Sequence, residues 1–308
     1  MNKLFGLFLL ALAFIVPPTA ANAACSGGAC FWIGGTGTVD GTLDNGKWAT
    51  TSGGASCACV PSTTDSVTFD GSSGTGTVTI NMGGALWTTG AFTMTLASGL
   101  TIDFATNSNS WASASGSFAA GGASTKTLNM GSGTFSLQSA ACGTNWDTSG
   151  SGLTLNAGTS TISIAACTTA TVARRFFGGG KTYATISVLG GTNSHLHFAN
   201  AGFTAATLTI AAPNTITFAN SNTFTITTFT NTTGTSSTPV FITNDGPLNG
   251  RATISSANNW TCTWCSIQYT AFSGGGTFTA NSSFGANNTG ITVNAPPAGG
   301  ATPRTIGG

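Results

Sequence analysis

Apolar and polar residues alternate along most of the chain, in runs of only a few residues. The run "TLTIAAPNTITFANSNTFTIT" shows the pattern, with leucine, isoleucine or phenylalanine at every second position of each short segment and threonine between them. A period of two is typical of β-strands with one buried face. The strand-like segments cover 75–81, 92–96, 100–105, 133–138, 152–165, 181–189, 206–230, 240–243 and 252–255. No segment carries a convincing apolar stripe of helical period, so the pattern predicts an all-β fold.

The spacing of these segments favours a parallel β-solenoid. The runs "TLTI", "TITF" and "TFTI" begin at equal intervals, at Thr207, Thr215 and Thr223. Strands this short, joined by corners of similar length, suit a coil of roughly 20–25 residues that stacks on its neighbours. A right-handed β-helix is the default expectation. Antiparallel β-sandwich repeats are the alternative, because short strands and turns look alike in both architectures.

Alternation also assigns the two faces of each strand. The residues predicted to face inward are Leu208, Ile210, Ile216, Phe218, Phe224 and Ile226. The residues predicted to face outward are Thr207, Thr209, Thr215, Thr217, Thr223 and Thr225. Phe229 falls out of phase with Phe224 and Ile226, which predicts a corner or bulge near Thr227 and Thr228. The outward threonines are either the outer surface of two solenoid faces or a lattice of hydroxyls and methyls like that of ice-binding proteins.

The N-terminus predicts export. A positive start at Lys3 precedes an apolar run from Leu4 to Val16, two prolines and the A-x-A sequence Ala21-Asn22-Ala23. This is the order of a signal peptide over residues 1–23, and its apolar run is shorter than the roughly 20 residues of a membrane span. No transmembrane segment is expected in the mature chain. The protein is therefore expected to be secreted, periplasmic or on the cell surface, with a virion surface as the alternative.

The mature chain divides into three predicted parts. Residues 24–70 are rich in aspartate, tryptophan and cysteine and are interpreted as an N-terminal cap, because an open solenoid end exposes unpaired strands. Residues 71–294 form the predicted solenoid, and the Pro/Gly-rich residues 295–308 form a predicted flexible tail.

The eight cysteines agree with export, where an even number usually forms disulfides. The candidate disulfide residues are Cys25, Cys30, Cys57, Cys59, Cys142, Cys167, Cys262 and Cys265. Two bridges are expected among the first four, and Cys142 is a candidate partner of Cys167. A zinc site is not expected, because C-x4-C followed by C-x-C is poor zinc spacing.

Charge argues against several functions. Only 5% of residues are charged and the net charge is +1, which gives no electrostatic reason to expect nucleic acid. No Asp, Glu, Lys or Arg lies between Lys181 and Asp245, so a long stretch lacks the acids and bases of a polysaccharide lyase or hydrolase. We therefore predict a non-enzymatic protein with no catalytic residue, metal or cofactor. A β-helical lyase or hydrolase is kept as an alternative.

Three smaller features are candidate sites. His195 and His197 lie on one face of a strand, where they are either two metal ligands or ordinary exposed residues. Arg174 and Arg175 either bind an anionic partner or occupy a solvated corner. The seven tryptophans could stack on sugars, although several are expected to be buried.

Several stretches together resemble Gly/Ser/Thr-rich β-solenoid proteins of bacteria and tailed phages, most of which are uncharacterised. They are "FWIGGTGT" (31–38), "VPSTTDSVTFDGSSGTGTVTIN" (60–81), "LTLNAGTSTISI" (153–164), "FGGGKTYATISV" (177–188), "TCTWCSIQ" (261–268) and "TFTANSSFGANNTG" (277–290). The resemblance implies a structural or adhesin-like surface role and supplies no catalytic residues. The predicted partner is a surface glycan or another protein surface, bound through an extended face. A phage tail structural protein is a further alternative.

Overall fold

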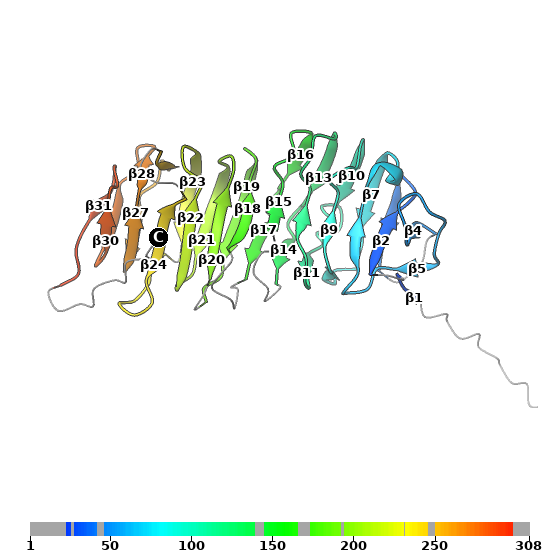
Figure 1. Ribbon diagram of the computed structural model, residues 1–308, viewed down its shortest axis with the longest axis horizontal. Coiled ribbons are helices and arrows are strands. Elements are labelled where there is room, and N and C mark those ends of the chain that lie inside the picture. The colour runs from blue at the N-terminus through cyan, green and yellow to red at the C-terminus, as the bar shows by residue number, and fades with distance from the viewer. Residues whose placement is uncertain are drawn as a thin grey trace, which may run out of the picture.

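The computed structural model describes residues 23–25, 28–41, 46–138, 145–165, 173–191, 194–230, 232–245 and 250–297. It is a β-solenoid of about eight turns, in which about half of the residues are in strands and almost none in helices. Strands of successive coils stand side by side from the blue N-terminal end to the red C-terminal end (Figure 1). The predicted all-β solenoid is confirmed.

The strands form stacked sheets that run along the solenoid. The twelve-stranded sheet contains, in spatial order, β4 (Trp48–Ala49), β2 (Ala29–Trp32), β6 (Ser66–Thr68), β9 (Phe92–Thr93), β12 (Phe118–Ala119), β15 (Asn145–Asp147), β18 (Arg174–Phe177), β20 (His195–Ala199), β22 (Asn214–Phe218), β24 (Val240–Asn244), β27 (Cys265–Gln268) and β30 (Phe284–Ala286). The nine-stranded sheet contains β8 (Trp87–Thr89), β11 (Trp111–Ser113), β14 (Thr134–Leu137), β17 (Thr161–Ile164), β19 (Thr182–Val188), β21 (Thr204–Ile210), β23 (Thr223–Thr230), β25 (Ala252–Ser255) and β28 (Thr270–Ser273).

Shorter sheets complete the coils at the two ends. The five-stranded sheet contains β3 (Gly37–Val39), β7 (Gly76–Ile80), β10 (Leu100–Asp103), β13 (Lys126–Asn129) and β16 (Leu153–Asn156). The three-stranded sheet near the C-terminal end contains β26 (Trp260–Thr263), β29 (Phe278–Asn281) and β31 (Thr292–Val293). A two-stranded sheet pairs β1 (Ala23–Ala24) with β5 (Cys59–Val60), and one 3-10 turn, η1, covers Gly71–Ser73.

Strand pairing between coils is parallel. Phe176 of β18 pairs with Phe198 of β20, which pairs with Phe218 of β22. Across the described strands, the one antiparallel pairing joins β2 and β4 at the N-terminal end. The parallel registers exclude the alternative of antiparallel sandwich repeats. The number of residues in a coil varies, for example from 22 between Phe176 and its partner Phe198 to 28 between Phe118 and its partner Trp146. The corners between the strands therefore contain loops of different length.

The phase break predicted in β23 is confirmed and has a structural cause. Ile226 is buried, Thr227 and Thr228 are both exposed, and Phe229 is half-buried. The same change occurs one coil earlier, where Ala205 pairs with Ile226. In both coils the alternation of inward and outward residues shifts by one at paired positions. The two strands therefore bend together around a corner, and the register between them is kept.

The core is a continuous column of apolar side chains inside the solenoid. All six residues predicted to face inward are buried, at most 1% exposed. An aromatic column follows the inner face of the twelve-stranded sheet through Phe92, Phe118, Trp146, Phe176, Phe198 and Phe218. The Phe118 ring stacks on Phe92 at 4.7 Å and on Trp146 at 4.2 Å between ring centroids. Asn244 of β24 follows Phe218 in this column and ends it.

The chain ends fall largely outside the described residues. The predicted signal peptide lies at 1–23 and the predicted tail at 295–308, of which only residue 23 and residues 295–297 are described. The cap boundary at residue 70 stays a prediction. At the N-terminal end, the rings of Trp32 and Trp48 meet edge to face at 5.2 Å. Within the described residues, no helix is long and apolar enough to cross a membrane.

Candidate functional site

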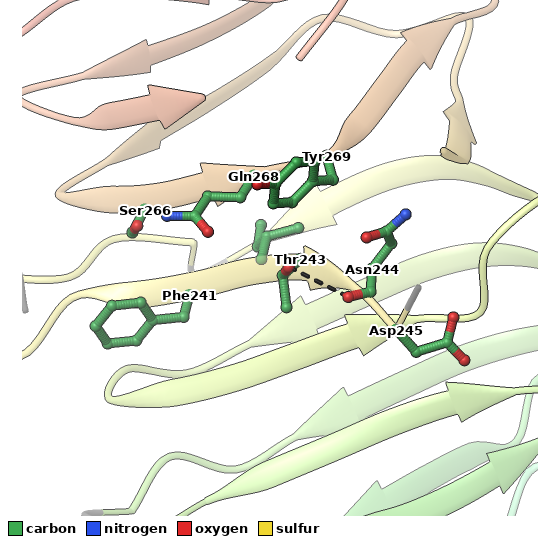
Figure 2. Close-up of a pocket in the computed structure, with 8 residues that line it drawn as sticks. Phe241, Thr243, Asn244, Asp245, Ser266, Gln268 and Tyr269 are labelled. Carbon is green, nitrogen blue, oxygen red and sulfur yellow. Dashed lines mark hydrogen bonds between the residues drawn. The ribbon is translucent and has the colours of Figure 1, made fainter. Parts of the chain in front are cut away.

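A groove lies on the outer face of the twelve-stranded sheet, where β24 and β27 end (Figure 2). Its volume is about 280 Å³. It is lined by Phe241, Ile242, Thr243, Asn244, Asp245, Ser266, Gln268 and Tyr269. Two aromatic residues, one of them with a hydroxyl, therefore border one concave surface with the hydroxyls of Thr243 and Ser266, the carboxamide of Gln268 and the carboxylate of Asp245.

Alternation along two paired strands places the groove side chains. Phe241 pairs with Ser266 of the next coil, so a large side chain stands beside a small one on the same outer face. Figure 2 shows Phe241 at one end, Thr243 in the middle and Asp245 at the other end. Tyr269 follows β27 at a corner with φ of 54°, a left-handed conformation that is rare for an aromatic residue. The residue in register on the next coil, Asn287, has the same conformation with φ of 56°, so this corner geometry repeats along the solenoid.

Asn244 connects the groove to the core. Its side chain takes the inward position of the aromatic column and is only 9% exposed. The Nδ2 group donates a hydrogen bond to the carbonyl oxygen of Gly250 at 2.7 Å, whereas Oδ1 has no hydrogen-bond partner. A recess of about 60 Å³ lies here, bordered by Asn244, Gly250, Arg251, Tyr269 and Asn287. Asn244 and Tyr269 border both the recess and the groove.

Asp245 is held by two partners at the edge of the groove. Its Oδ2 atom lies 2.9 Å from Nε2 of His197, and its Oδ1 accepts a hydrogen bond from the backbone N–H of Asn220 at 2.7 Å. The carboxylate is thus fixed in position, as a binding group would be, and it is the single carboxylate among the groove residues.

The two histidines have different environments. Nε2 of His195 lies 2.8 Å from the hydroxyl of Thr217, one coil away. Burial, with a smaller effect from His197, holds the pKa of His195 below its ordinary value. Within the described residues, no third His, Cys or Asp completes a metal-ligand set with this pair. The geometry supports an ordered polar surface on β20 and does not assemble a metal centre.

The six threonines predicted to face outward are divided between two sheets. Thr215 and Thr217 lie on β22 of the twelve-stranded sheet, and Thr217 is only 8% exposed. The other four lie on β21 and β23 of the nine-stranded sheet. Thr207 and Thr209 align with Thr228 and Thr230, beyond the corner, rather than with Thr223 and Thr225.

That alignment belongs to a longer array that the sequence pattern alone did not reveal. Five neighbouring strands carry a hydroxyl residue at two equivalent positions, and their pairs are Thr134/Ser136, Thr161/Ser163, Thr185/Ser187, Thr207/Thr209 and Thr228/Thr230. Of these residues, Ser136 at the end of the array is only 8% exposed. The hydroxyls of Thr209 and Thr230 lie 2.6 Å apart, so at least one of these contacts is a hydrogen bond between coils.

Three of the candidate cysteine pairs are formed. They are Cys25–Cys30, Cys57–Cys59 and Cys262–Cys265. The first two are adjacent, because Sγ of Cys25 lies 3.1 Å from Sγ of Cys59. Cys142 and Cys167 lie outside the described residues.

The paired arginines do not share one environment. Arg174 is 1% exposed, and its Nη1 donates to the carbonyl oxygen of Leu137 at 3.1 Å. The solvated-corner interpretation is therefore wrong for Arg174, because β18 turns this side chain into the coil. Burial lowers its pKa. Arg175 faces outward and pairs with His197 of the next coil.

The aromatic residues of the groove were also missed. Sequence reasoning named the tryptophans as sugar-stacking candidates, yet six of the seven are buried and Trp264 alone is half-buried. Phe241 and Tyr269 are the aromatic residues that line the groove. A signal was present, since Phe241 occupies an outward position of its strand, where threonine is the usual residue in this chain.

Comparison with models of known protein families, with curated proteins and with solved structures gave no significant match.

Proposed function

We propose that the protein is an exported, non-enzymatic β-solenoid scaffold that binds a surface glycan through the groove at β24 and β27. The observation that carries the proposal is the combination of Phe241 and Tyr269 with carboxamide and hydroxyl groups in one cavity of about 280 Å³. The three formed disulfides support export, because such bridges persist in oxidising compartments.

A glycan fits this chemistry better than an apolar or a highly charged ligand. A sugar ring has an apolar C–H face and a rim of hydroxyls, so it needs an aromatic surface beside hydrogen-bonding groups. The groove offers Tyr269 as such a surface and Thr243, Ser266 and Gln268 as partners for hydroxyls. Its net charge is low, which favours neutral saccharides over polyanions.

The same residues support a binding role over a hydrolytic one. Glycoside hydrolases generally use two carboxyl groups on opposite sides of the scissile bond. The groove has one carboxylate, Asp245, which already accepts hydrogen bonds from His197 and Asn220. Asp103 of β10 and Asp147 of β15 lie on different sheets, the five-stranded and the twelve-stranded one.

The experiment is a glycan array followed by calorimetry on the purified protein. Tyr269→Ala is expected to weaken the binding of an array hit by at least about tenfold, which corresponds to about 1.4 kcal/mol. Leu96→Ala is the matched control, because this exposed side chain lies outside the groove, at 66% exposure. Circular dichroism should be unchanged in both variants. Absence of any glycan binding, or equal affinity in Tyr269→Ala, would reject the proposal.

Ice binding is the second candidate function, and the hydroxyl array of the nine-stranded sheet favours it. Two columns of Thr or Ser extend over five coils in register, with residues about 6.7 Å apart along a strand and about 4.8 Å apart between coils. Thr185→Tyr would interrupt the centre of the array and should abolish thermal hysteresis, whereas Thr215→Tyr on the other sheet should not. A wild-type protein without thermal hysteresis would eliminate this candidate.

A further inference from the structure

We propose that the recess beside Asn244 is a subsite for a secondary amide, so that the groove selects N-acetylhexosamine residues over other sugars. This inference rests on the proposed glycan-binding function and names its ligand class. The recess opens beside Tyr269, so a sugar ring against this side chain would direct a ring substituent toward Asn244.

The first requirement comes from the unpartnered oxygen of Asn244. An amide can be turned by half a rotation, but turning this one would place Oδ1 against the carbonyl oxygen of Gly250, which is also an acceptor. The hydrogen bond to Gly250 therefore fixes Oδ1 as the atom without a partner. In the view of Figure 2 this oxygen lies on the side of Tyr269. A buried acceptor without a donor is unfavourable, so the recess favours a ligand N–H or O–H.

The second requirement comes from Arg251 on the wall of the same recess. Its side chain is exposed, and within the described residues its guanidinium forms no hydrogen bond or ion pair. A guanidinium carries donors only and is always protonated, so it favours a ligand oxygen. The recess therefore calls for a donor and an acceptor on one small group.

A secondary amide meets both requirements, whereas a carboxylate offers only acceptors and an ammonium only donors. An amide N–H can donate to Oδ1 of Asn244 while its carbonyl accepts from Arg251. A carboxylate would suit Arg251 but would place a second acceptor against Asn244. An ammonium would suit Asn244 but would be repelled by Arg251. Uronic acids and free hexosamines should therefore bind less well than N-acetylated sugars.

The size of the recess agrees with an acetamido group. The recess, at about 60 Å³, has about a fifth of the volume of the groove, about 280 Å³, so it suits a ring substituent rather than a second sugar ring. A hydroxyl also carries a donor and an acceptor, but it is smaller than an acetamido group and would leave more of this space unfilled.

The test compares short oligosaccharides of N-acetylglucosamine, glucosamine and glucose in the same linkage by calorimetry. The acetylated series is expected to bind at least about tenfold more tightly than either of the others. Arg251→Ala should lower the affinity for the acetylated series to near that for the glucose series. The affinity for the glucose series should not change. Arg175→Ala, an exposed arginine on the same sheet outside the groove, is the matched control and should change neither.

The outcomes separate this inference from the proposed function. Equal affinity for acetylated and plain oligosaccharides, both weakened by Tyr269→Ala, would overturn the subsite and leave glycan binding in place. Failure of all oligosaccharides and of the array would overturn both. Asn244→Leu is a second variant, which removes the hydrogen-bond acceptor of the recess and keeps the size of the side chain, whereas Arg251→Ala removes the donor. An unchanged preference for the acetylated series in Asn244→Leu and in Arg251→Ala would also overturn the subsite.

Discussion

Replacing Ile216 with aspartate is the sharpest test of the alternation on which the fold assignment rests. Ile216 lies in the middle of β22, is fully buried, and pairs with Leu196 on one side and Ile242 on the other. The neighbouring residue on the same strand, Thr215, points to the opposite face and is half-exposed. If the alternation is correct, Ile216→Asp and Thr215→Asp must have very different consequences.

The expected cost of Ile216→Asp has two parts. Loss of the buried aliphatic side chain costs about 2–5 kcal/mol, as for isoleucine-to-alanine changes in cores. Burying a carboxylate adds several kcal/mol unless a cation is in contact. Among the described residues of the same column, the buried cation is Arg174, whose backbone lies two coils or about 10 Å away and whose Nη1 already donates to the carbonyl oxygen of Leu137. The sum approaches the whole stability of a typical domain, about 5–15 kcal/mol.

The assay is urea unfolding followed by circular dichroism, with Ile216→Val and Ile216→Ala as graded variants. We expect losses of about 1 kcal/mol for valine and about 2–5 kcal/mol for alanine, and no folded protein for aspartate. Thr215→Asp should stay within about 1 kcal/mol of wild type, because the site is half-exposed and pairs with His195. An unchanged midpoint for Ile216→Asp, or equal losses for Ile216→Asp and Thr215→Asp, would refute the inward assignment.

Three further predictions follow from single contacts. Burial lowers the pKa of His195 in the folded protein, so the unfolded chain binds a proton first as the pH falls through 6.5. The free energy of unfolding should therefore decrease below that pH. A His195→Asn variant should lose this pH dependence in a series of thermal melts. A Cβ at Gly202 would collide with a backbone carbonyl of the next coil, so Gly202→Ala should lower the free energy of unfolding by more than about 2 kcal/mol. A Cβ at Gly71 has no atom within 4 Å, so Gly71→Ala should be nearly neutral in the same melts. The double variant Cys262→Ala/Cys265→Ala should be less stable than wild type by about 2 kcal/mol or less in denaturant unfolding, because the two cysteines are only three residues apart and their disulfide closes a short loop. Reductant should cause the same loss of stability in the wild-type protein.

The fold could be predicted because its signals are local. Alternation identifies the buried side of each strand, as with Phe224 and Ile226, and an error of one residue would invert every assignment. The phase break before Phe229 was also readable, since two adjacent polar residues cannot belong to one uninterrupted strand face. These signals need no knowledge of the neighbouring coil.

The register between coils could not be predicted, because it depends on the lengths of the corners. Thr207 aligns with Thr228 and not with Thr223, so the hydroxyl array became visible only after the coils were stacked. Arg174 was misplaced for a related reason. Sequence reasoning expected an arginine at a corner to be solvated, but β18 begins at this residue and turns it inward, where a backbone carbonyl accepts its hydrogen bond.

The groove coincides with the end of the aromatic column in the core. Successive coils fill one inward position with aromatic rings up to Phe218, and the next coil places Asn244 there. A buried carboxamide is less favourable than a ring at this position, because one of its polar atoms has no partner. Where a sequence departs from its own pattern at a cost in stability, binding is the usual reason. Asn244→Phe should therefore stabilise the protein and abolish the recess, and a variant that is less stable than wild type would contradict this explanation.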